Sequence, residues 1–344
     1  MKKSILSVFV FILIIVLLSG CVPAPTLPIV STYLPIDTPI QTKTSRSTSA
    51  RTLDITGKYL MVFHACDTKV TDCHDYQNHR VYLAQSDDGA QWSMVPGWKA
   101  YSGSVPDVIR RGGTIYIYTP GKVVRYHLDS GILEDPINVT VKGAEGFVDP
   151  SVFVDDQGRL VLFFLYGRIG GDPAGCMPDQ TKCENRIGSA TEVEGSDGLN
   201  FVVDEGDRAT VTISPSGPIR TASDPDIFFD GKQYVLFIAY GPSISLWTSP
   251  ELRGTYSQSA KLSDGMLTNN SGGVAAGYFD QVTQQYWTFA HISDQNQKTL
   301  IRRAVHENLS RQISDSDWVA ITSESLGLTA TTNIESQGFA VNEP

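Results

Sequence analysis

One phrase occurs three times in this sequence: a short segment with proline and aspartate, a glycine turn, and then a run of apolar and aromatic residues. The three copies cover 105–118, 149–163 and 224–237. Each copy has the pattern of a β-hairpin, two strands joined by a tight turn. Proline lacks a backbone N–H and is tolerated mainly at the first residue of a strand, so Pro106, Pro150 and Pro225 mark where each hairpin begins.

The spacing of these prolines indicates the architecture. Pro106 and Pro150 are 44 positions apart, and Pro150 and Pro225 are 75 apart, which indicates an insertion in the second interval. A period of about 40–50 residues is typical of a four-stranded propeller blade. No long segment beyond the N-terminus has the 3.6-residue apolar period of an amphipathic helix. We therefore predict an all-β fold, a five-bladed β-propeller of four-stranded antiparallel blades.

Five blades can be placed along the chain. Their predicted ranges are about 52–98, 103–142, 147–213, 222–262 and from 271 onward. Residues beyond about Ser323 should form a closing strand or a cover, because ring closure removes the edges that a propeller would otherwise expose. The acidic turn from Ser86 to Trp92 recurs from Ser196 to Phe201, and we interpret both as structural Asp-Gly turns followed by an aromatic residue that packs between blades.

The charge of the chain excludes one class of partner. The formal net charge is −10 at pH 7, and lysine and arginine form no cluster with interleaved aromatic residues. Nucleic-acid binding requires such a basic surface. The sequence therefore predicts no nucleic-acid partner.

The N-terminus has the pattern of a targeting segment. Lys2 and Lys3 precede an apolar run from Ile5 to Leu18, which is shorter than the roughly 20 residues of a membrane-spanning helix. The following segment, Leu18 to Cys21, resembles the lipobox of bacterial lipoproteins. This resemblance implies a signal peptide at 1–20, acylation of Cys21 and an extracytoplasmic protein anchored to a bacterial membrane; an ordinary signal peptide is the alternative.

The segment after Cys21 has a different composition. It is rich in Pro, Thr and Ser, so we expect a disordered tether over 21–50 and the propeller over 51–344. The predicted protein is a monomer held to the membrane surface through its lipid.

Four further cysteines form two pairs with equal spacing, Cys66 with Cys73 and Cys176 with Cys183. In an oxidising compartment each pair would close a small loop as a disulfide. A zinc site is the alternative, since His64 and His74 flank the first pair. Zinc-binding cysteine pairs usually have two to four residues between them and these have more, which favours the disulfides.

The inner-strand segments resemble those of a known enzyme family. The segment 105–108 is similar to the second-blade motif of the five-bladed glycoside hydrolases of the arabinanase and β-xylosidase type, family 43 and its relatives. In that motif an aspartate, here Asp107, tunes the pKa of the general acid. The segment 148–158 is similar to their third-blade strand, which is chiefly architectural. The resemblance covers about 52–318 and implies a glycoside hydrolase with a saccharide partner.

The family's chemistry indicates which residues to consider. Inverting hydrolysis needs a carboxylate base and a protonated carboxyl about 6.5–9.5 Å apart. The inner strands of successive blades start around one channel, so acids there should converge, and close like charges would raise the pKa of one of them. The candidate catalytic residues are Asp107, Asp149, Asp224 and Asp226.

The sequence departs from the family at two expected carboxylates. The family has a glutamate two residues before the fourth-blade proline, where this chain has Ser223 followed by Asp224. The family's base is an aspartate that opens blade 1; the corresponding position before Gly57 is Ala50, and the nearest acid is Asp54. Catalysis by this chain therefore requires a rearranged set of acids.

The remaining predictions concern the ligand. Trp98, Tyr101, Trp247 and His291 are candidate sugar contacts, and packing between blades is the alternative for the aromatic residues. The sequence predicts no cofactor and no catalytic metal, although a structural calcium ion in the channel is compatible with the resemblance. Three functions remain. The first is a glycoside hydrolase that acts on a polysaccharide in the central channel of the propeller, and the second is a non-catalytic protein with a degenerate site that binds glycan in the same channel. The third is a sialidase-like enzyme, for which the chain lacks an evident arginine cluster.

Overall fold

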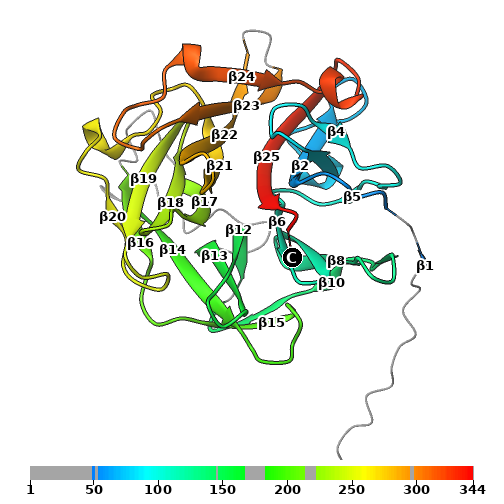
Figure 1. The fold of residues 1–344 in the computed structure, drawn as a ribbon, viewed down its shortest axis with the longest axis horizontal. Coiled ribbons are helices and arrows are strands. Elements are labelled where there is room, and N and C mark those ends of the chain that lie inside the picture. Colours follow the sequence, from blue (N-terminus) through cyan, green and yellow to red (C-terminus); the bar gives the residue numbers. More distant parts are fainter. Residues whose placement is uncertain are drawn as a thin grey trace, which may run out of the picture. The chain divides into compact units, whose positions relative to one another are not determined.

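The computed structural model describes residues 49–50, 53–144, 146–166, 183–213, 222–294 and 298–343. The predicted signal peptide, Cys21, nearly all of the tether and Cys176 lie outside these ranges, as does the side chain of Cys183. In the described ranges the chain forms five sheets arranged as the blades of a propeller (Figure 1), antiparallel except for the pair β11 and β15 in blade 3. The predicted fold class is confirmed.

Each blade is a sheet whose first strand faces the axis. Blade 1 contains, from the axis outward, β25 (Thr332–Val341), β2 (Tyr59–Asp67), β3 (Arg80–Ser86) and β4 (Ser93–Met94), with β5 (Tyr101–Ser102) also paired to β3. Blade 2 contains β6 (Asp107–Arg111), β7 (Thr114–Thr119), β8 (Lys122–His127), β9 (Ile132–Leu133) and β1 (Ser49–Ala50), with β10 (Ile137–Asn138) paired to β8. Blade 3 contains β12 (Phe147–Val154), β13 (Leu160–Tyr166), β14 (Cys183–Glu192), β15 (Asn200–Val203) and β11 (Thr140–Lys142), with β16 (Ala209–Ile213) paired to β14. Blade 4 contains β17 (Ala222–Phe229), β18 (Tyr234–Tyr240), β19 (Ser243–Ser249) and β20 (Ser257–Gln258). Blade 5 contains β21 (Gly273–Asp280), β22 (Gln285–Ser293), β23 (Thr299–His306) and β24 (Trp318–Ile321).

Helical structure in the described ranges is limited to four short 3₁₀ turns: η1 (Tyr76–Asn78), η2 (Ser263–Gly265), η3 (Asp315–Asp317) and η4 (Glu324–Leu326). No helix in these ranges is long and apolar enough to span a bilayer.

The ring closes through the C-terminal strand. β25 lies at the axis and pairs antiparallel with β2, from Tyr59 opposite Val341 to Asp67 opposite Thr332 (Figure 1). The predicted closing strand is therefore confirmed. One expectation fails: residues 53–57 form no strand, so the inner strand of blade 1 comes from the far end of the chain and not from the segment before Gly57.

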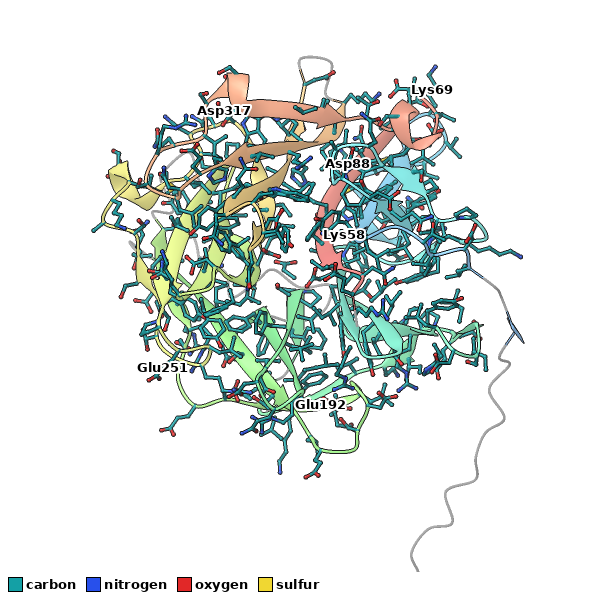
Figure 2. The ribbon with its side chains drawn as sticks, in the orientation of Figure 1. Lys58, Lys69, Asp88, Glu192, Glu251 and Asp317 are labelled. Carbon is teal, nitrogen blue, oxygen red and sulfur yellow. A yellow bond between two sulfur atoms is a disulfide. The ribbon has the colours of Figure 1, made fainter. Side chains whose placement is uncertain are left out.

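The core consists of apolar clusters between neighbouring blades, one at each of the five interfaces of the described propeller. Alternating side chains of one strand serve two interfaces: in β7, Ile115 and Ile117 pack against blade 1, while Tyr116 and Tyr118 pack against blade 3. Side chains fill these spaces throughout the molecule (Figure 2). Glu192, labelled there, is nearly buried and pairs with Arg111 across the interface of blades 2 and 3.

The acidic outer turns have the structural role that the sequence predicted. Asp88 accepts the N–H groups of Ala90 and Gln91, each at 2.8 Å, and Gly89 has a φ of +68°. The following Trp92 is buried and donates its indole N–H to the carbonyl of Gly89 at 2.9 Å. This geometry holds the turn and gives no support to a sialidase-type site.

Candidate functional site at the propeller axis

An irregular residue stands at the corresponding place in every blade, within the inner strand in four blades and two residues before β6 in blade 2. These residues have a positive φ and are Val105, Asp149, Asp224, Val274 and Ser336. In four of the blades the pairing with the second strand shifts register at this point, which marks a β-bulge. A positive φ is uncommon for residues other than glycine and costs free energy for a β-branched residue such as valine. Bulges redirect side chains, and here they turn one side chain of each blade toward the axis.

These five positive-φ residues surround the central channel. Its walls are formed by the bulge residues and the one or two residues after each, including Pro106, Pro150 and Pro225. The predicted axial position of the three prolines is confirmed. The free volume is about 20 Å³, which holds a water molecule but no sugar ring. The channel is therefore too small to hold a saccharide in its interior, contrary to the expectation of a ligand bound there.

Two of the predicted catalytic acids fasten adjacent blades. The carboxylate of Asp107 accepts the N–H of Val152 in the next blade at 2.7 Å, and that of Asp226 accepts the N–H of Gly277 at 2.7 Å. Ser151 occupies the same position in blade 3 and accepts the N–H of Ile227 at 3.1 Å. We call Asp107, Ser151 and Asp226 the blade latches.

Both acidic latches are buried and have raised pKa values. Burial raises the pKa of Asp107 to about 7. Burial, and then the charge of Asp107, raises the pKa of Asp226 well above its usual range. Because each is buried and has one oxygen bonded to the backbone of the next blade, these two side chains are poorly placed to act on a substrate.

The other two predicted acids lie together at the bulges. The backbone N–H of Asp224 approaches the Asp149 carboxylate at 3.4 Å, and the hydroxyl of Ser223 donates to Asp224 at 2.6 Å. Burial raises the pKa of Asp224 to about 6. Burial and the adjacent charge of Asp224 raise the pKa of Asp149 well above its usual range. This pair therefore holds at least one proton near neutral pH.

A carboxylate that the sequence interpretation missed lies one residue before the blade 1 bulge. Glu335 is on β25, and its Oε2 is 3.6 Å from Nε2 of His64. Burial opposes ionisation of Glu335, but its interactions with the nearby His64 and His291 lower its pKa to about 2. Glu335 is thus ionised at neutral pH.

The two histidines beside Glu335 have their tautomers set by the neighbouring bulges. Nδ1 of His64 accepts the N–H of Val105 at 3.1 Å, and Nδ1 of His291 accepts the N–H of Ser336 at 3.1 Å. Burial lowers the pKa of both, that of His291 to about 4, so both rings are neutral at pH 7. Each neutral ring then carries its proton on Nε2, and that of His64 faces Glu335.

A roomy cavity adjoins this acid. Its volume is about 600 Å³, within the range of about 300–1,000 Å³ that is usual for small-molecule sites. It lies beside the starts of β25 and β23, the end of β22 and the loop after β2. Its lining residues are Thr68, Thr71, Asp72, Cys73, His74, His291, Ser293, Thr299, Asn333 and Glu335. On β25, Glu335 lines the cavity and the next residue, Ser336, lines the channel. The cavity therefore lies at the end of the channel near the start of β25, which we call the strand-start mouth.

Of the four predicted sugar contacts, His291 lines this cavity. Trp98 and Tyr101 pack against the apolar cluster between blades 1 and 2, with the Trp98 indole bonded to the carbonyl of Val81 at 3.1 Å. Trp247 packs at the interface of blades 3 and 4 and donates to Ser245 at 2.8 Å. The structure therefore places the three aromatic residues in inter-blade packing, the alternative that the sequence left open.

The first predicted disulfide is present. Cys66 and Cys73 are bonded, with their Cα atoms 5.7 Å apart. The second predicted disulfide, Cys176 with Cys183, falls outside the described side chains. Among the described residues, no three His, Cys, Asp or Glu side chains converge as metal ligands, and the channel acids do not form a calcium ligand set.

Comparisons with known proteins agree with the fold. No family model matches the sequence, and no curated protein matches it. The structure of the GH43_1 enzyme from Xanthomonas citri complexed with xylose aligns with a TM-score of 0.50 and 17% identity, over 81% of this chain and 91% of that chain. The family 43 arabinoxylan arabinofuranohydrolase from Bacillus subtilis in complex with cellotetraose aligns with a TM-score of 0.50 and 16% identity, over 78% of this chain and 68% of that chain.

The chain has the five-bladed propeller fold of these family 43 structures. At this level of identity the similarity concerns the fold and assigns no reaction to the chain.

Proposed function

We propose that the protein is a carbohydrate-active protein of the glycoside-hydrolase type that binds the end of a saccharide chain at the strand-start mouth of its propeller. The observation that carries this proposal is the placement of Glu335 between a polar cavity of about 600 Å³ and the channel that holds Asp149 and Asp224. A cavity beside carboxyl groups of opposite protonation is what hydrolysis of a glycosidic bond requires.

The two kinds of carboxyl would have different roles. Glu335 is ionised at neutral pH and would act as the base that takes a proton from the attacking water. Asp224, with a pKa of about 6 and Asp149 beside it, would donate a proton to the leaving oxygen. Turnover should therefore fall as the pH rises above about 6, because the donor loses its proton.

A second function is favoured by a specific observation. Ser223 occupies the position of the glutamate that the family resemblance leads one to expect, and its hydroxyl is bonded to Asp224 at 2.6 Å. A protein that retained the cavity and lost its strongest proton donor would bind glycan without cleaving it. In either case the acylated Cys21 would hold the propeller at a membrane surface, where it retains saccharide near the cell.

The neighbouring structures suggest which ligands to test. The Xanthomonas citri enzyme was captured with xylose and the Bacillus subtilis enzyme with cellotetraose. A panel of oligosaccharides from xylan, arabinan, cellulose, fructan and galactan should be tested for binding by calorimetry and for cleavage by chromatography. We expect at least one of them to bind.

Variants of the acids then separate the two functions. Replacement Glu335→Gln or Asp224→Asn should lower kcat by about 10²–10⁴ and leave Kd nearly unchanged, since each removes one proton-transfer group. Asp156→Asn, at an exposed position that lines neither the channel nor the cavity, is the control with the same change of charge. Binding without product would establish the non-catalytic function, and the absence of binding to every saccharide would refute the proposal.

A further inference from the structure

The loop closed by the Cys66–Cys73 disulfide forms one wall of the cavity. It leaves the end of β2 and supplies half of the cavity lining: Thr68, Thr71, Asp72, Cys73 and His74. The opposite wall comes from β22, β23 and β25 of the propeller. The loop residues Thr68, Thr71, Asp72 and His74 are exposed, so they are available to a ligand.

Several contacts besides the disulfide hold this loop in place. Thr331 donates its hydroxyl to Asp67 at 2.7 Å and accepts the N–H of Thr68 at 3.1 Å. At the other end of the loop, the ring of His79 bonds to the carbonyl of Cys73 at 3.0 Å. The wall is therefore fixed at both ends before any ligand arrives, and a fixed wall lowers the ordering cost of binding.

The chemistry of the lining indicates how a ligand is recognised. Asp72 and Glu335 offer acceptors, the hydroxyl groups of Thr71 and Ser293 offer donors and acceptors, and no Trp, Tyr or Phe is among the lining residues. The ring of His74 makes no hydrogen bond to any other described residue, and one oxygen of Asp72 is used by the N–H of His74 at 3.0 Å. Free donors and acceptors without an aromatic platform suit a hydroxyl-rich unit that is held by hydrogen bonds and not by ring stacking.

We propose that the disulfide-closed loop is the specificity wall of the saccharide site, with Asp72 and His74 as direct contacts to the hydroxyl groups of the terminal sugar. This inference rests on the proposed function, because it assigns contacts within the same cavity. The disulfide acts by holding Cys73, and with it the adjacent Asp72 and His74, against the cavity.

The test measures saccharide affinity by calorimetry, with the oligosaccharide from the panel above that binds the wild type most tightly. Asp72→Ala and His74→Ala should each weaken binding about 10-fold, by loss of one or two hydrogen bonds to the ligand. Lys69 is on the same loop, is exposed and does not line the cavity, so the Kd of the Lys69→Ala variant should equal that of the wild type.

Reduction of the Cys66–Cys73 disulfide allows a second measurement of saccharide affinity, one that replaces no side chain of the lining. Dithiothreitol would supply two electrons, become a cyclic disulfide and leave two protonated thiols at Cys66 and Cys73. Affinity should fall at least 10-fold while the circular dichroism of the propeller strands is unchanged.

The outcomes distinguish the two proposals. Wild-type affinity in the reduced protein and in both alanine variants would overturn the role of the loop and leave the proposed function intact. No binding of any saccharide by the wild type would overturn both.

Discussion

As the pH rises, the wild type should lose stability that the Asp107→Asn variant keeps, so the difference in stability should grow in favour of the variant. The carboxylate of Asp107 is 5% exposed and accepts the N–H of Val152 from the next blade. Asparagine has the same shape, and its carbonyl oxygen can accept the same N–H. The variant therefore keeps the latch, removes the titratable proton of Asp107 and removes the charge that raises the pKa of Asp226.

The size of the effect follows from the pKa. Burial raises it from 3.8 to about 7, so the folded state holds this proton more tightly than the unfolded chain does. A raised carboxyl pKa lowers stability as the pH rises from about 4 to about 7, with no further change above that range. At roughly 1.4 kcal/mol per pKa unit the full penalty is about 4 kcal/mol, of which about 3 kcal/mol develops between pH 5 and pH 8.

Differential scanning calorimetry at pH 5 and pH 8 measures this difference. With about 2 °C per kcal/mol for a domain of this size, the Tm of Asp107→Asn relative to the wild type should rise by roughly 6 °C between the two pH values. Asp156→Asn makes the same change of charge at an exposed site and should show no such rise. An equal Tm difference at both pH values would refute the view that Asp107 is protonated near neutrality.

Three further outcomes are expected. Gly338→Ala should lower stability by about 1–3 kcal/mol, because a Cβ there would overlap the Asp107 carboxylate and displace the latch; a Tm equal to that of the wild type would contradict this. The double replacement Cys66→Ser and Cys73→Ser should lower the free energy of unfolding in denaturant by roughly 2.5 kcal/mol, the value for closure of a loop this short. Peptide mapping of the wild type without reductant should find the disulfides Cys66–Cys73 and Cys176–Cys183. Cys21→Ala should move the protein from the membrane fraction to the soluble fraction, and an unchanged membrane fraction would argue against acylation at this residue.

The sequence was sufficient to predict the blades because the signals are local. Pro106, Pro150 and Pro225 lie at the channel as predicted, but only Pro106 directly precedes its strand, since β12 and β17 each begin three residues before their proline. The glycine turns and apolar runs that follow them define the first two strands of blades 2, 3 and 4. Alternation within one strand, as in β7, then assigns its side chains to the two flanking interfaces. All of this depends on a few residues that are close together in the chain.

The roles of the acids could not be predicted in this way because they depend on the bulges. Asp224 and Asp226 are two positions apart on β17, yet Asp224 meets Asp149 at the channel while Asp226 binds the backbone of blade 5. Both residues line the channel, and the backbone at Asp224, whose φ is +48°, sets their different partners. Residue type and spacing do not reveal such a conformation in aspartate.

Glu335 was missed for a topological reason. The expected base was sought before Gly57, at the start of the first blade in sequence, but the inner strand of that blade is β25, which begins at Thr332, 275 positions later. A closing strand was expected from the C-terminal region, and a search of that strand for a carboxyl group would have found Glu335 next to the bulge at Ser336.

The position of Ser223 allows a test of the proposed chemistry by gain of function. Ser223 lies on β17 directly before the bulge of blade 4, as Glu335 lies directly before the bulge of blade 1. A carboxyl group added there would stand beside Asp224, where burial already raises pKa values, so it should be protonated and able to donate. If Glu335 is the base and a weak donor limits turnover, Ser223→Glu should raise kcat at least 10-fold on the saccharide that binds, since a well-placed acid contributes about 10²–10⁴ in rate. Ser223→Gln has the same length without the proton and loses the same hydroxyl bond to Asp224, so it is the matched control, and the kcat of Ser223→Glu should exceed that of Ser223→Gln. Equal kcat values for the two variants, with unchanged Kd, would show that a weak proton donor does not limit turnover at this site.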